Sequence, residues 1–481
     1  MNKKSHLTVY VYALVILLLQ GCIFEQLDES LSNSERINKF IINGVHTYYL
    51  WEAETDWKIM DKRETYGAAA YSNHYKLFDQ LRYRDDAWSM LTDDINDMEN
   101  QFAGVSTTFG YTLSFYYNPI TNNKEVIAII LYTTPDSPAT RKGLKRGDVI
   151  IEMNGNRLTS DNYMNLYMAS SLRLRCGQID FDTQTVISLP EIYDLTAVQM
   201  YENPINAYRI IEKGSKKIGY LCYTGFQRES ERELFALFSS FKSADVQDIV
   251  LDLRYNPGGY SVTAQIFSSI LAPASAVYSK SVYLEHHYNQ LYTDYIKSKG
   301  YSFYETFIDT LPVNMNLSRL YVLTGKYTAS ASEALMVGLD PYLNIIQIGD
   351  TTAGKFCGGV LLSPEDIYEE KNKNYYERFS NWGMYIMIYR YANKNGIKSF
   401  AGRLAPEILV EEITGIEDVY NLKPFGDEND PLLGNALAHI TGIPYLELRS
   451  ARSGLPLIPL PAPKKTIDGL LIATPEIISS Y

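Results

Sequence analysis

The stretch DIVLDLRYNPGGYSVTAQIFSSIL, residues 248–271, decides the fold. Residues 248–253 are nearly continuous in apolar side chains, which is typical of a strand buried on both faces of a sheet. Two glycines, Gly258 and Gly259, follow in a turn, and residues 262–271 then have the spacing of an amphipathic helix. A buried strand that leads through a glycine turn into a helix predicts an α/β layer.

The same alternation continues on both sides of this stretch. Strands are predicted at residues 218–223, 320–324, 345–349 and 384–391, and a helix at residues 229–241. We assign these segments to one core, residues 201–425, and residues 426–481 to a C-terminal tail. The last 30 residues hold several prolines, so we expect a loosely structured extension there.

Ser330 lies between a predicted strand and a predicted helix, in the sequence TASASE of residues 328–333. Such a junction exposes a hydroxyl and presents the amides that follow it. The N–H of Ala331 is therefore a candidate oxyanion donor, together with that of Gly258 or Gly259. Two simpler explanations remain open: Ser330 or Ser332 caps the helix, and the glycines serve close packing of strand against helix.

A nucleophilic serine needs a base, and the histidines offer none with catalytic context. They are His6, His46, His74, His286, His287 and His439. Lys355 is the candidate base, because it lies after a predicted strand in the small-residue turn TTAGKF, residues 351–356. A lysine base must be neutral, which requires burial to lower its pKa from about 10.4 by roughly three units, or about 4 kcal/mol. The alternative is an ordinary exposed lysine on a loop.

Composition and charge exclude several classes of protein. The chain has 481 residues, 46% of them hydrophobic and 21% charged, which is typical of a globular protein of about three domains. Its formal net charge is −12, and it has no block rich in lysine and arginine. It therefore lacks the basic surface with which proteins bind DNA or RNA, and we expect no nucleic-acid partner.

The N-terminus has the features of an export signal. Lys3 and Lys4 precede an apolar run, residues 7–19, that is too short to span a membrane. The sequence LQGC that ends at Cys22 resembles the bacterial lipobox. We therefore expect a signal peptide at residues 1–21, lipidation of Cys22, and a lipid-anchored location in the cell envelope.

Residues 22–101 are predicted to form a helical N-terminal region. Apolar residues recur at helical spacing over residues 33–49, with Asn33 or Ser34 able to cap the start. A second helix is expected over residues 85–99.

Residues 102–200 change to short strands and turns. The sequence SPATRKGLKRGDVIIEMNG, residues 137–155, resembles a PDZ domain. That module binds an extended C-terminal peptide along a sheet edge and captures its carboxylate on backbone N–H groups. The resemblance implies a binding loop at Phe109, Gly110, Tyr111, Thr112 and Leu113, although this loop keeps only one of the usual two glycines. A packing domain with no ligand is the alternative.

Three motifs together resemble the C-terminal processing, or tail-specific, serine peptidases. They are DLRYNPGG at residues 252–259, TASASE at 328–333, and AGK at 353–355, with Lys355 placed 25 residues after Ser330. The resemblance implies a multidomain α/β protein whose core is related to crotonase and the Clp protease subunit. It implies Ser330 as nucleophile, Lys355 as general base, an oxyanion hole of Ala331 with Gly258 or Gly259, and no metal or cofactor.

The chain departs from the family pattern at two places. Gly359 stands where many members have a glutamine, and Pro341 stands where some have an aspartate, with Asp340 one position earlier. A third catalytic group is therefore left unassigned. The sequence predicts an envelope-anchored serine endopeptidase that binds and cuts proteins near unstructured C-termini. The alternative is a catalytically inactive lipoprotein that uses its PDZ domain to bind peptides or apolar ligands.

Overall fold

The computed structural model describes residues 27, 29–55, 57, 72–121, 124–396, 402–445, 455–461 and 471–472. The chain divides into two compact units. Unit 1 contains residues 1–95 and 362–385, and unit 2 contains residues 96–361 and 386–481. Cys22 and the predicted signal peptide lie outside the described residues.

Unit 1 is mostly helical. It contains α2 (Asn33–Tyr48), α4 (His74–Leu81), β1 (Met90–Thr92), α13 (Pro364–Tyr368), α14 (Lys373–Tyr376) and the first residues of β19 (Gly383–Ala392). The predicted helix over residues 33–49 is confirmed, but Ser32 caps it in a reciprocal capping box with Glu35. The predicted helix over residues 85–99 is wrong over most of its length. Met90–Thr92 forms an antiparallel strand with β19, and α5 (Ile95–Phe102) begins only afterwards.

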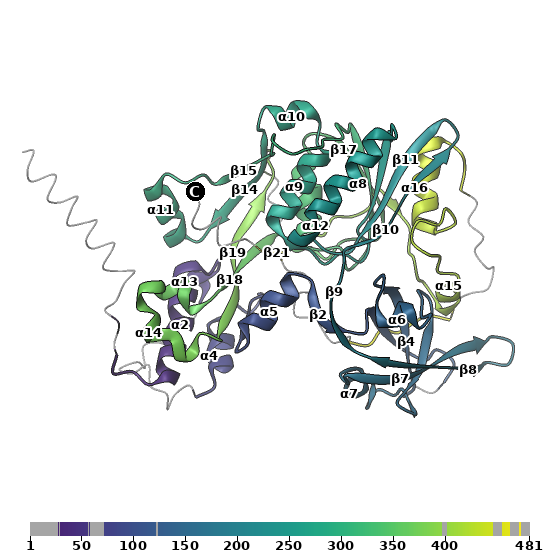
Figure 1. The fold of residues 1–481 in the computed structure, drawn as a ribbon, viewed down its shortest axis with the longest axis horizontal. Coiled ribbons are helices and arrows are strands. Elements are labelled where there is room, and N and C mark those ends of the chain that lie inside the picture. Colours follow the sequence, from purple (N-terminus) through teal and green to yellow (C-terminus); the bar gives the residue numbers. More distant parts are fainter. Residues whose placement is uncertain are drawn as a thin grey trace, which may run out of the picture. The chain divides into compact units, whose positions relative to one another are not determined.

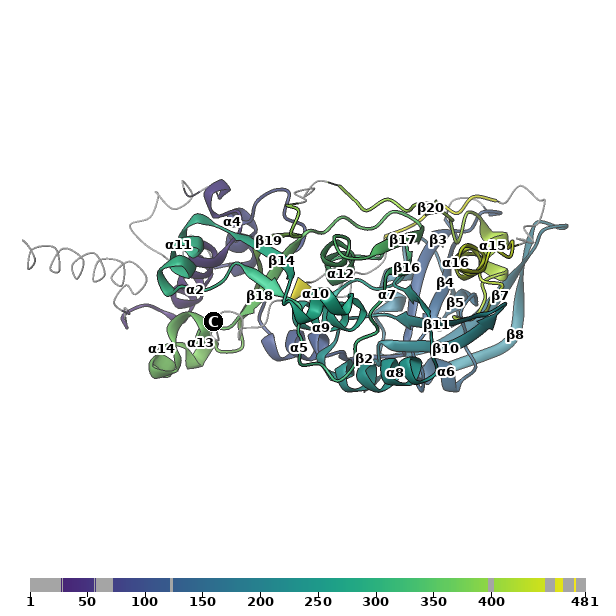
Figure 2. The ribbon, with the colours of Figure 1, turned by 90° about the horizontal axis from the view of Figure 1, so that it is seen from above.

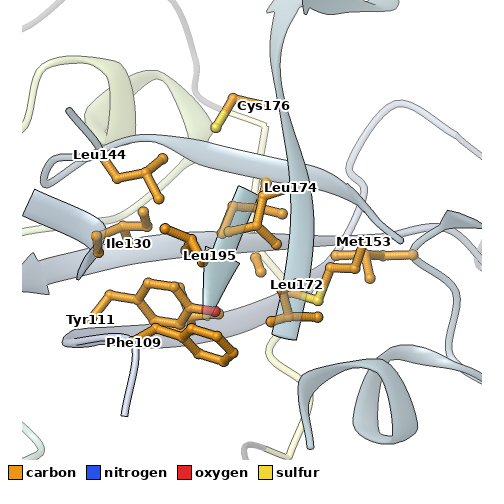
Figure 3. Close-up of a cluster of buried hydrophobic side chains, with 14 of the residues drawn as sticks. Phe109, Tyr111, Ile130, Leu144, Met153, Leu172, Leu174, Cys176 and Leu195 are labelled. Atoms are coloured by element: carbon orange, nitrogen blue, oxygen red, sulfur yellow. The ribbon is translucent and has the colours of Figure 1, made fainter. Parts of the chain in front are cut away.

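Unit 2 contains a small β-rich domain, which we call the β3–β8 domain. Its sheet has the order β3 (Tyr111–Tyr117), β4 (Val126–Thr133), β5 (Val149–Met153), β7 (Ser171–Asp180) and β8 (Thr185–Thr196). The short helices α6 (Pro138–Arg141) and α7 (Tyr163–Tyr167) lie in its connections. Figure 3 shows part of its apolar core, in which Phe109 and Tyr111 stack with ring centroids 5.6 Å apart.

The larger part of unit 2 is built on a mostly parallel sheet. Its strands run in the order β10 (Ile205–Lys213), β11 (Lys216–Tyr223), β12 (Asp248–Asp252), β16 (Arg319–Thr324), β17 (Asn344–Gly349) and β20 (Ile408–Leu409). All neighbouring pairs are parallel except β10 with β11. This order confirms the α/β layer, because each predicted strand from residue 218 to 349 matches one of the observed strands.

Helices cover both faces of this sheet (Figures 1 and 2). On one face lie α8 (Glu231–Ser243), α9 (Ser261–Leu271) and α12 (Ala331–Leu339), and the rings of Tyr223 and Phe267 meet there with centroids 5.3 Å apart. The other face packs against α16 (Pro431–Thr441), whose leucines share a cluster with Tyr220 and Val250. Because α16 is part of this core, the core extends into the region that the sequence assigned to the tail, residues 426–481.

A second sheet brings short strands together beside the first. In unit 2 it joins β13 (Gly259–Tyr260), β21 (Leu471–Ile472), β18 (Cys357–Leu362), the later residues of β19, β14 (Val282–Tyr288) and β15 (Tyr304–Thr306). Strand β13 begins at Gly259, the last residue of the glycine turn, and β18 begins directly after the turn that holds Lys355. The loops at the ends of the two sheets therefore carry the candidate site.

Candidate active site

Ser330 occupies a strained turn at the start of α12. Its backbone has φ 64° and ψ −112°, a combination that costs a residue other than glycine about 1–3 kcal/mol. The residue is fully buried, and its hydroxyl has no hydrogen-bond partner in the part of the chain that the structure describes. Ser330 Oγ therefore does not cap α12, and a hydroxyl held in such a turn is available for chemistry.

Glu333 connects the serine turn to the lysine turn. Its Oε2 accepts hydrogen bonds from the backbone N–H groups of Ser330 and Lys355, both at 2.8 Å. Its Oε1 accepts from the Gly354 N–H at 2.7 Å and from the Thr352 hydroxyl at 2.5 Å. Burial raises the pKa of Glu333, and these four hydrogen bonds act in the opposite direction. One carboxylate thus fixes the backbones of the two residues predicted to be nucleophile and base.

Lys355 is buried in the turn between β17 and β18, with only 1% of its surface exposed. This excludes the explanation of an exposed surface lysine. The hydroxyl of Tyr391, on β19, donates to the Ser330 carbonyl at 3.3 Å and to the Lys355 carbonyl at 3.2 Å. Tyr391 is therefore a second connection between the serine and lysine turns.

The glycine turn after β12 packs directly against the serine turn. The Asn256 carbonyl accepts from the Ala329 N–H and from the Ser332 hydroxyl, both at 3.1 Å. Ser332 therefore uses its hydroxyl to join two loops. The Asn256 side chain also accepts from the Gly258 N–H at 2.9 Å.

The hydrogen bond to Gly258 bears on the choice between the predicted oxyanion donors. The Gly258 N–H already has an acceptor within the loop, which counts against Gly258. Ala331 is the first residue of α12, where an N–H has no acceptor within the helix. Gly259 has φ 139°, and a Cβ there would lie 2.2 Å from the Phe226 carbonyl oxygen, so only glycine fits. Ala331 and Gly259 are therefore the candidate donors that the proposal below uses.

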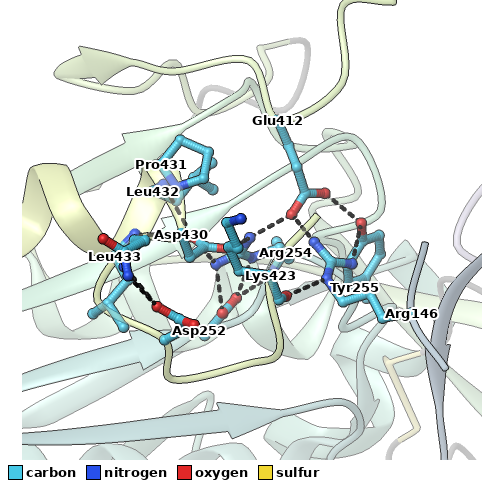
Figure 4. Close-up of polar contacts among 12 residues, drawn as sticks. Arg146, Asp252, Arg254, Tyr255, Glu412, Lys423, Asp430, Pro431, Leu432 and Leu433 are labelled. Atoms are coloured by element: carbon cyan, nitrogen blue, oxygen red, sulfur yellow. Dashed lines mark hydrogen bonds and ion pairs between the residues drawn. The ribbon is translucent and has the colours of Figure 1, made fainter. Parts of the chain in front are cut away.

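A buried ionic network holds the start of the glycine loop (Figure 4). Arg254 forms ion pairs with Asp252, Asp430 and Glu412, at 2.8 Å for each of the two aspartates. Arg146, from the β3–β8 domain, also binds Glu412. Burial disfavours the charge on Glu412, but the two arginines outweigh it and lower its pKa to about 2. The network fixes the residues from which the loop to Gly259 departs, and it ties the β3–β8 domain to the core.

The predicted peptide-binding loop forms the beginning of β3. The side chains of Phe109, Tyr111 and Leu113 are buried in the core of the β3–β8 domain. Gly110 has φ 75°, and its carbonyl accepts from the Ser137 hydroxyl at 3.1 Å. The loop therefore leaves its backbone, and not its apolar side chains, as the part that can meet a ligand.

Sequence reasoning missed Glu333, Asn256 and Tyr391. Glu333 stands inside the TASASE motif, but a glutamate three residues after a serine is also the pattern of a helix cap. Asn256 stands inside DLRYNPGG, a motif in which only the two glycines indicate a function from sequence alone. Nothing in the sequence around Tyr391 distinguishes it from the other 39 tyrosines.

Comparison with known proteins identifies the class of protein that this fold and site define. The family model for Peptidase family S41 matches residues 217–410, and the Peptidase S41 N-terminal domain matches residues 36–90. The chain belongs to peptidase family S41, whose members are serine peptidases and therefore hydrolases.

Curated relatives are C-terminal processing proteases. The chain is 23% identical over 313 residues to the carboxy-terminal processing protease CtpB of Bacillus subtilis, a match that covers 63% of this chain and 60% of that protein. It is 24% identical to the chloroplastic C-terminal processing peptidase of Tetradesmus obliquus, covering 78% and 75% of the two chains.

Solved structures show the same fold. A putative S41 protease from Bacteroides fragilis has a TM-score of 0.66 at 23% identity, covering 88% of this chain and all of that one. The photosystem II D1 C-terminal processing protease has a TM-score of 0.50 at 17% identity, covering 84% of this chain and all of that one.

Two features are absent from the described residues. None of the helices among them combines the length and the apolar composition of a membrane span. Within the same residues, no three histidine, cysteine, aspartate or glutamate side chains are grouped so that they could hold a metal ion.

Proposed function

We propose that the protein is a serine endopeptidase that cuts proteins near unstructured C-termini, with Ser330 as nucleophile and Lys355 as general base. One observation carries the proposal: Glu333 binds the backbones of Ser330 and Lys355 together, while the Ser330 hydroxyl has no partner in the described chain. A merely structural serine at a helix start would use its hydroxyl to cap the helix.

The reaction proceeds through an acyl-enzyme. Ser330 Oγ attacks the scissile carbonyl carbon and its proton passes to the neutral Lys355 amine. The N–H groups of Ala331 and Gly259 bind the oxyanion that forms. The C–N bond then breaks, and Lys355 returns the proton to the leaving amine. Water then attacks the ester and gives one proton to Lys355. Lys355 passes this proton to Ser330 Oγ, and the N-terminal fragment of the substrate leaves with a new carboxyl terminus.

The missing glutamine at Gly359 requires another means of holding the base. Glu333 and Tyr391 supply it, since each bonds to the backbone of Lys355 and of Ser330. They act through position and do not touch the reacting atoms, so we regard them as positioning residues.

We further propose that the β3–β8 domain is a PDZ domain that receives the substrate's C-terminal strand along β3. The proposed anchor is a lipid on Cys22, which would hold the enzyme in the bacterial cell envelope. Labelling with a radioactive fatty acid should be lost in Cys22→Ser, and retention of the label would contradict the anchor.

A fluorophosphonate probe tests the catalytic assignment directly. We expect covalent labelling of the purified protein, abolished by Ser330→Ala and kept by Ser332→Ala, whose hydroxyl bonds to Asn256 and takes no part in the reaction. Absence of labelling from pH 6 to 10 would favour the inactive binding protein instead.

The base is tested separately. Lys355→Ala should abolish cleavage of an unfolded protein without lowering the melting temperature, because a buried neutral lysine contributes little to stability. A large drop in Tm would identify Lys355 as a structural residue.

A further inference from the structure

The C-terminal segment returns to unit 2 in two places. Residues 455–461 run beside the β3–β8 domain, and residues 471–472 form β21 in the sheet next to the glycine and lysine turns. The sequence suggested only a loosely structured extension here. Both pieces instead make backbone contacts with elements that the proposed function assigns to the substrate.

The first piece adds a strand to the open edge of β3. The Tyr117 N–H donates to the Ile458 carbonyl at 3.0 Å, and the Leu460 N–H donates to the Phe115 carbonyl at 2.9 Å. The other edge of β3 is paired with β4. The Tyr163 hydroxyl, on α7, donates to the Pro461 carbonyl at 2.9 Å. The segment therefore lies between β3 and α7 and uses the strand-addition geometry of a bound peptide.

The direction of this strand is that of a C-terminal ligand. It is antiparallel to β3, with Pro459 opposite Tyr116, so that higher residue numbers lead toward the loop at Gly110. That loop is the one proposed to capture a terminal carboxylate. The Leu460 side chain packs against the core of the domain, as an anchoring ligand side chain would.

The prolines of this segment suit such a role. Pro459 has no N–H, but the groups that bond to β3 belong to Ile458 and Leu460, so the pairing loses no donor there. Proline also restricts the free segment to extended conformations, which lowers the entropy lost on docking.

The second piece lies beside the catalytic turns. β21 is parallel to β13, pairing Leu471 with Gly259, and parallel to β18, pairing Ile472 with Gly359 (Figure 1). Gly259 is the proposed oxyanion donor, and Gly359 follows Lys355 by four residues. The segment thus occupies a strand position between the two loops that would flank a scissile peptide.

We propose that residues 455–461 and 471–472 act as an intramolecular pseudosubstrate: the first segment occupies the peptide edge of β3, the second occupies the strand position between β13 and β18, and both must leave before a substrate binds. This inference rests on the proposed function, because it names the internal competitor of the same site. A tethered segment acts at an effective concentration of about 1 mM. If the free peptide binds with a Kd of about 0.1 mM, the tail weakens substrate binding about tenfold.

A matched pair of substitutions tests the first contact. Leu460→Asp places a charge against the core of the domain, whereas Ile458→Asp places it on a side chain that is 58% exposed in the same segment. At substrate concentrations below KM, we expect Leu460→Asp to raise kcat/KM about tenfold and Ile458→Asp to leave it within twofold. A synthetic peptide of residues 455–472 should inhibit Leu460→Asp more strongly than the wild type. Equal rates for Leu460→Asp and the wild type would overturn the proposal.

A chain that stops after Pro461 tests the second contact and guards against misfolding of Leu460→Asp. It keeps the strand on β3 and lacks β21. We expect its Ser330 to react with the fluorophosphonate several times faster than in the full chain. An unchanged labelling rate would contradict a blocking role for β21.

Hydrogen exchange separates failure of this inference from failure of the proposed function. In the Ser330→Ala protein, which needs no activity, the Tyr117 N–H should be protected and should lose protection when Leu460→Asp is added. If this change in protection is seen but the wild-type protein never reacts with the probe, the peptidase is refuted and the internal ligand remains established. A Tyr117 N–H that exchanges freely in both proteins would refute the internal ligand.

Discussion

Replacing Glu333 with glutamine should damage catalysis without touching a reacting atom. The carboxylate accepts from four donors, two at each oxygen. Glutamine offers one acceptor oxygen and one NH2 group, so in either orientation the NH2 group faces a backbone N–H. An unmatched buried donor costs about 1–3 kcal/mol, and the loops can avoid this cost by moving apart.

The size of the effect follows from that movement. The Gly354 N–H lies 2.7 Å from the Glu333 carboxylate, and relieving a contact between two donors requires a shift of about 1 Å in the lysine turn. A misplacement of about 1 Å costs about 100-fold in rate, or about 2.7 kcal/mol of barrier. We therefore expect kcat of Glu333→Gln to fall about 100-fold. The effect on unfolding is less informative, because removing a buried charge offsets the lost hydrogen bonds.

The same substitution at Glu305 is the matched control. Glu305 is also buried, but neither of its carboxyl oxygens has a hydrogen-bond partner among the described residues, and the nearest charged or titratable contact is His286 Nε2 at 3.5 Å from Oε1. Burial raises its pKa to about 8, so the carboxyl is mostly protonated at pH 7 and glutamine is a close mimic. Cleavage rates and fluorophosphonate labelling should be within twofold of the wild type for Glu305→Gln. Similar rates for both variants would refute the assignment of Glu333 as the residue that positions nucleophile and base.

Three further outcomes are expected. Burial raises the pKa of Glu305, so the folded protein keeps a proton on this carboxyl that the unfolded chain releases. The unfolding free energy, measured by urea titration, should therefore fall by about 2 kcal/mol from pH 6.5 to 8 and remain level in Glu305→Gln. A pH dependence that survives the substitution would show that Glu305 is not its cause. Gly259→Ala should destabilise the protein by more than about 2 kcal/mol and abolish probe labelling, because its Cβ would meet the Phe226 carbonyl, whereas Gly143→Ala, with φ 87° but open space around it, should cost only about 1 kcal/mol. Tyr391→Phe removes the hydroxyl that binds both catalytic turns and should lower kcat severalfold with KM unchanged, and an equal rise in KM would place Tyr391 in substrate binding instead.

The sequence predicted the elements whose patterns are local. The strand at residues 248–253 and the helix at residues 262–271 were found to within one residue, because a buried apolar strand and a glycine turn leave a signal within a dozen positions. Ser330 and Lys355 became candidates in the same way, since each stands in a small-residue turn after a strand.

The misses depend on partners far away in the chain. Residues 90–92 have the spacing of a helix but become a strand because they pair with β19, almost 300 residues later. Residues 455–461 have the composition of an extension and acquire order by pairing with distant residues, on β3 and at Gly415. Glu333 was missed because three of its four donors come from residues 352–355, about 20 positions later in the chain.

The strained turn at Ser330 has an evolutionary consequence. A residue with a Cβ raises the free energy of the folded chain in this backbone conformation, whereas glycine adopts it without strain. Substitution of Ser330 by glycine should therefore stabilise the folded protein while removing the proposed nucleophile. Relatives that are no longer selected for activity should accumulate glycine at this position. Retention of serine there would therefore indicate selection for activity.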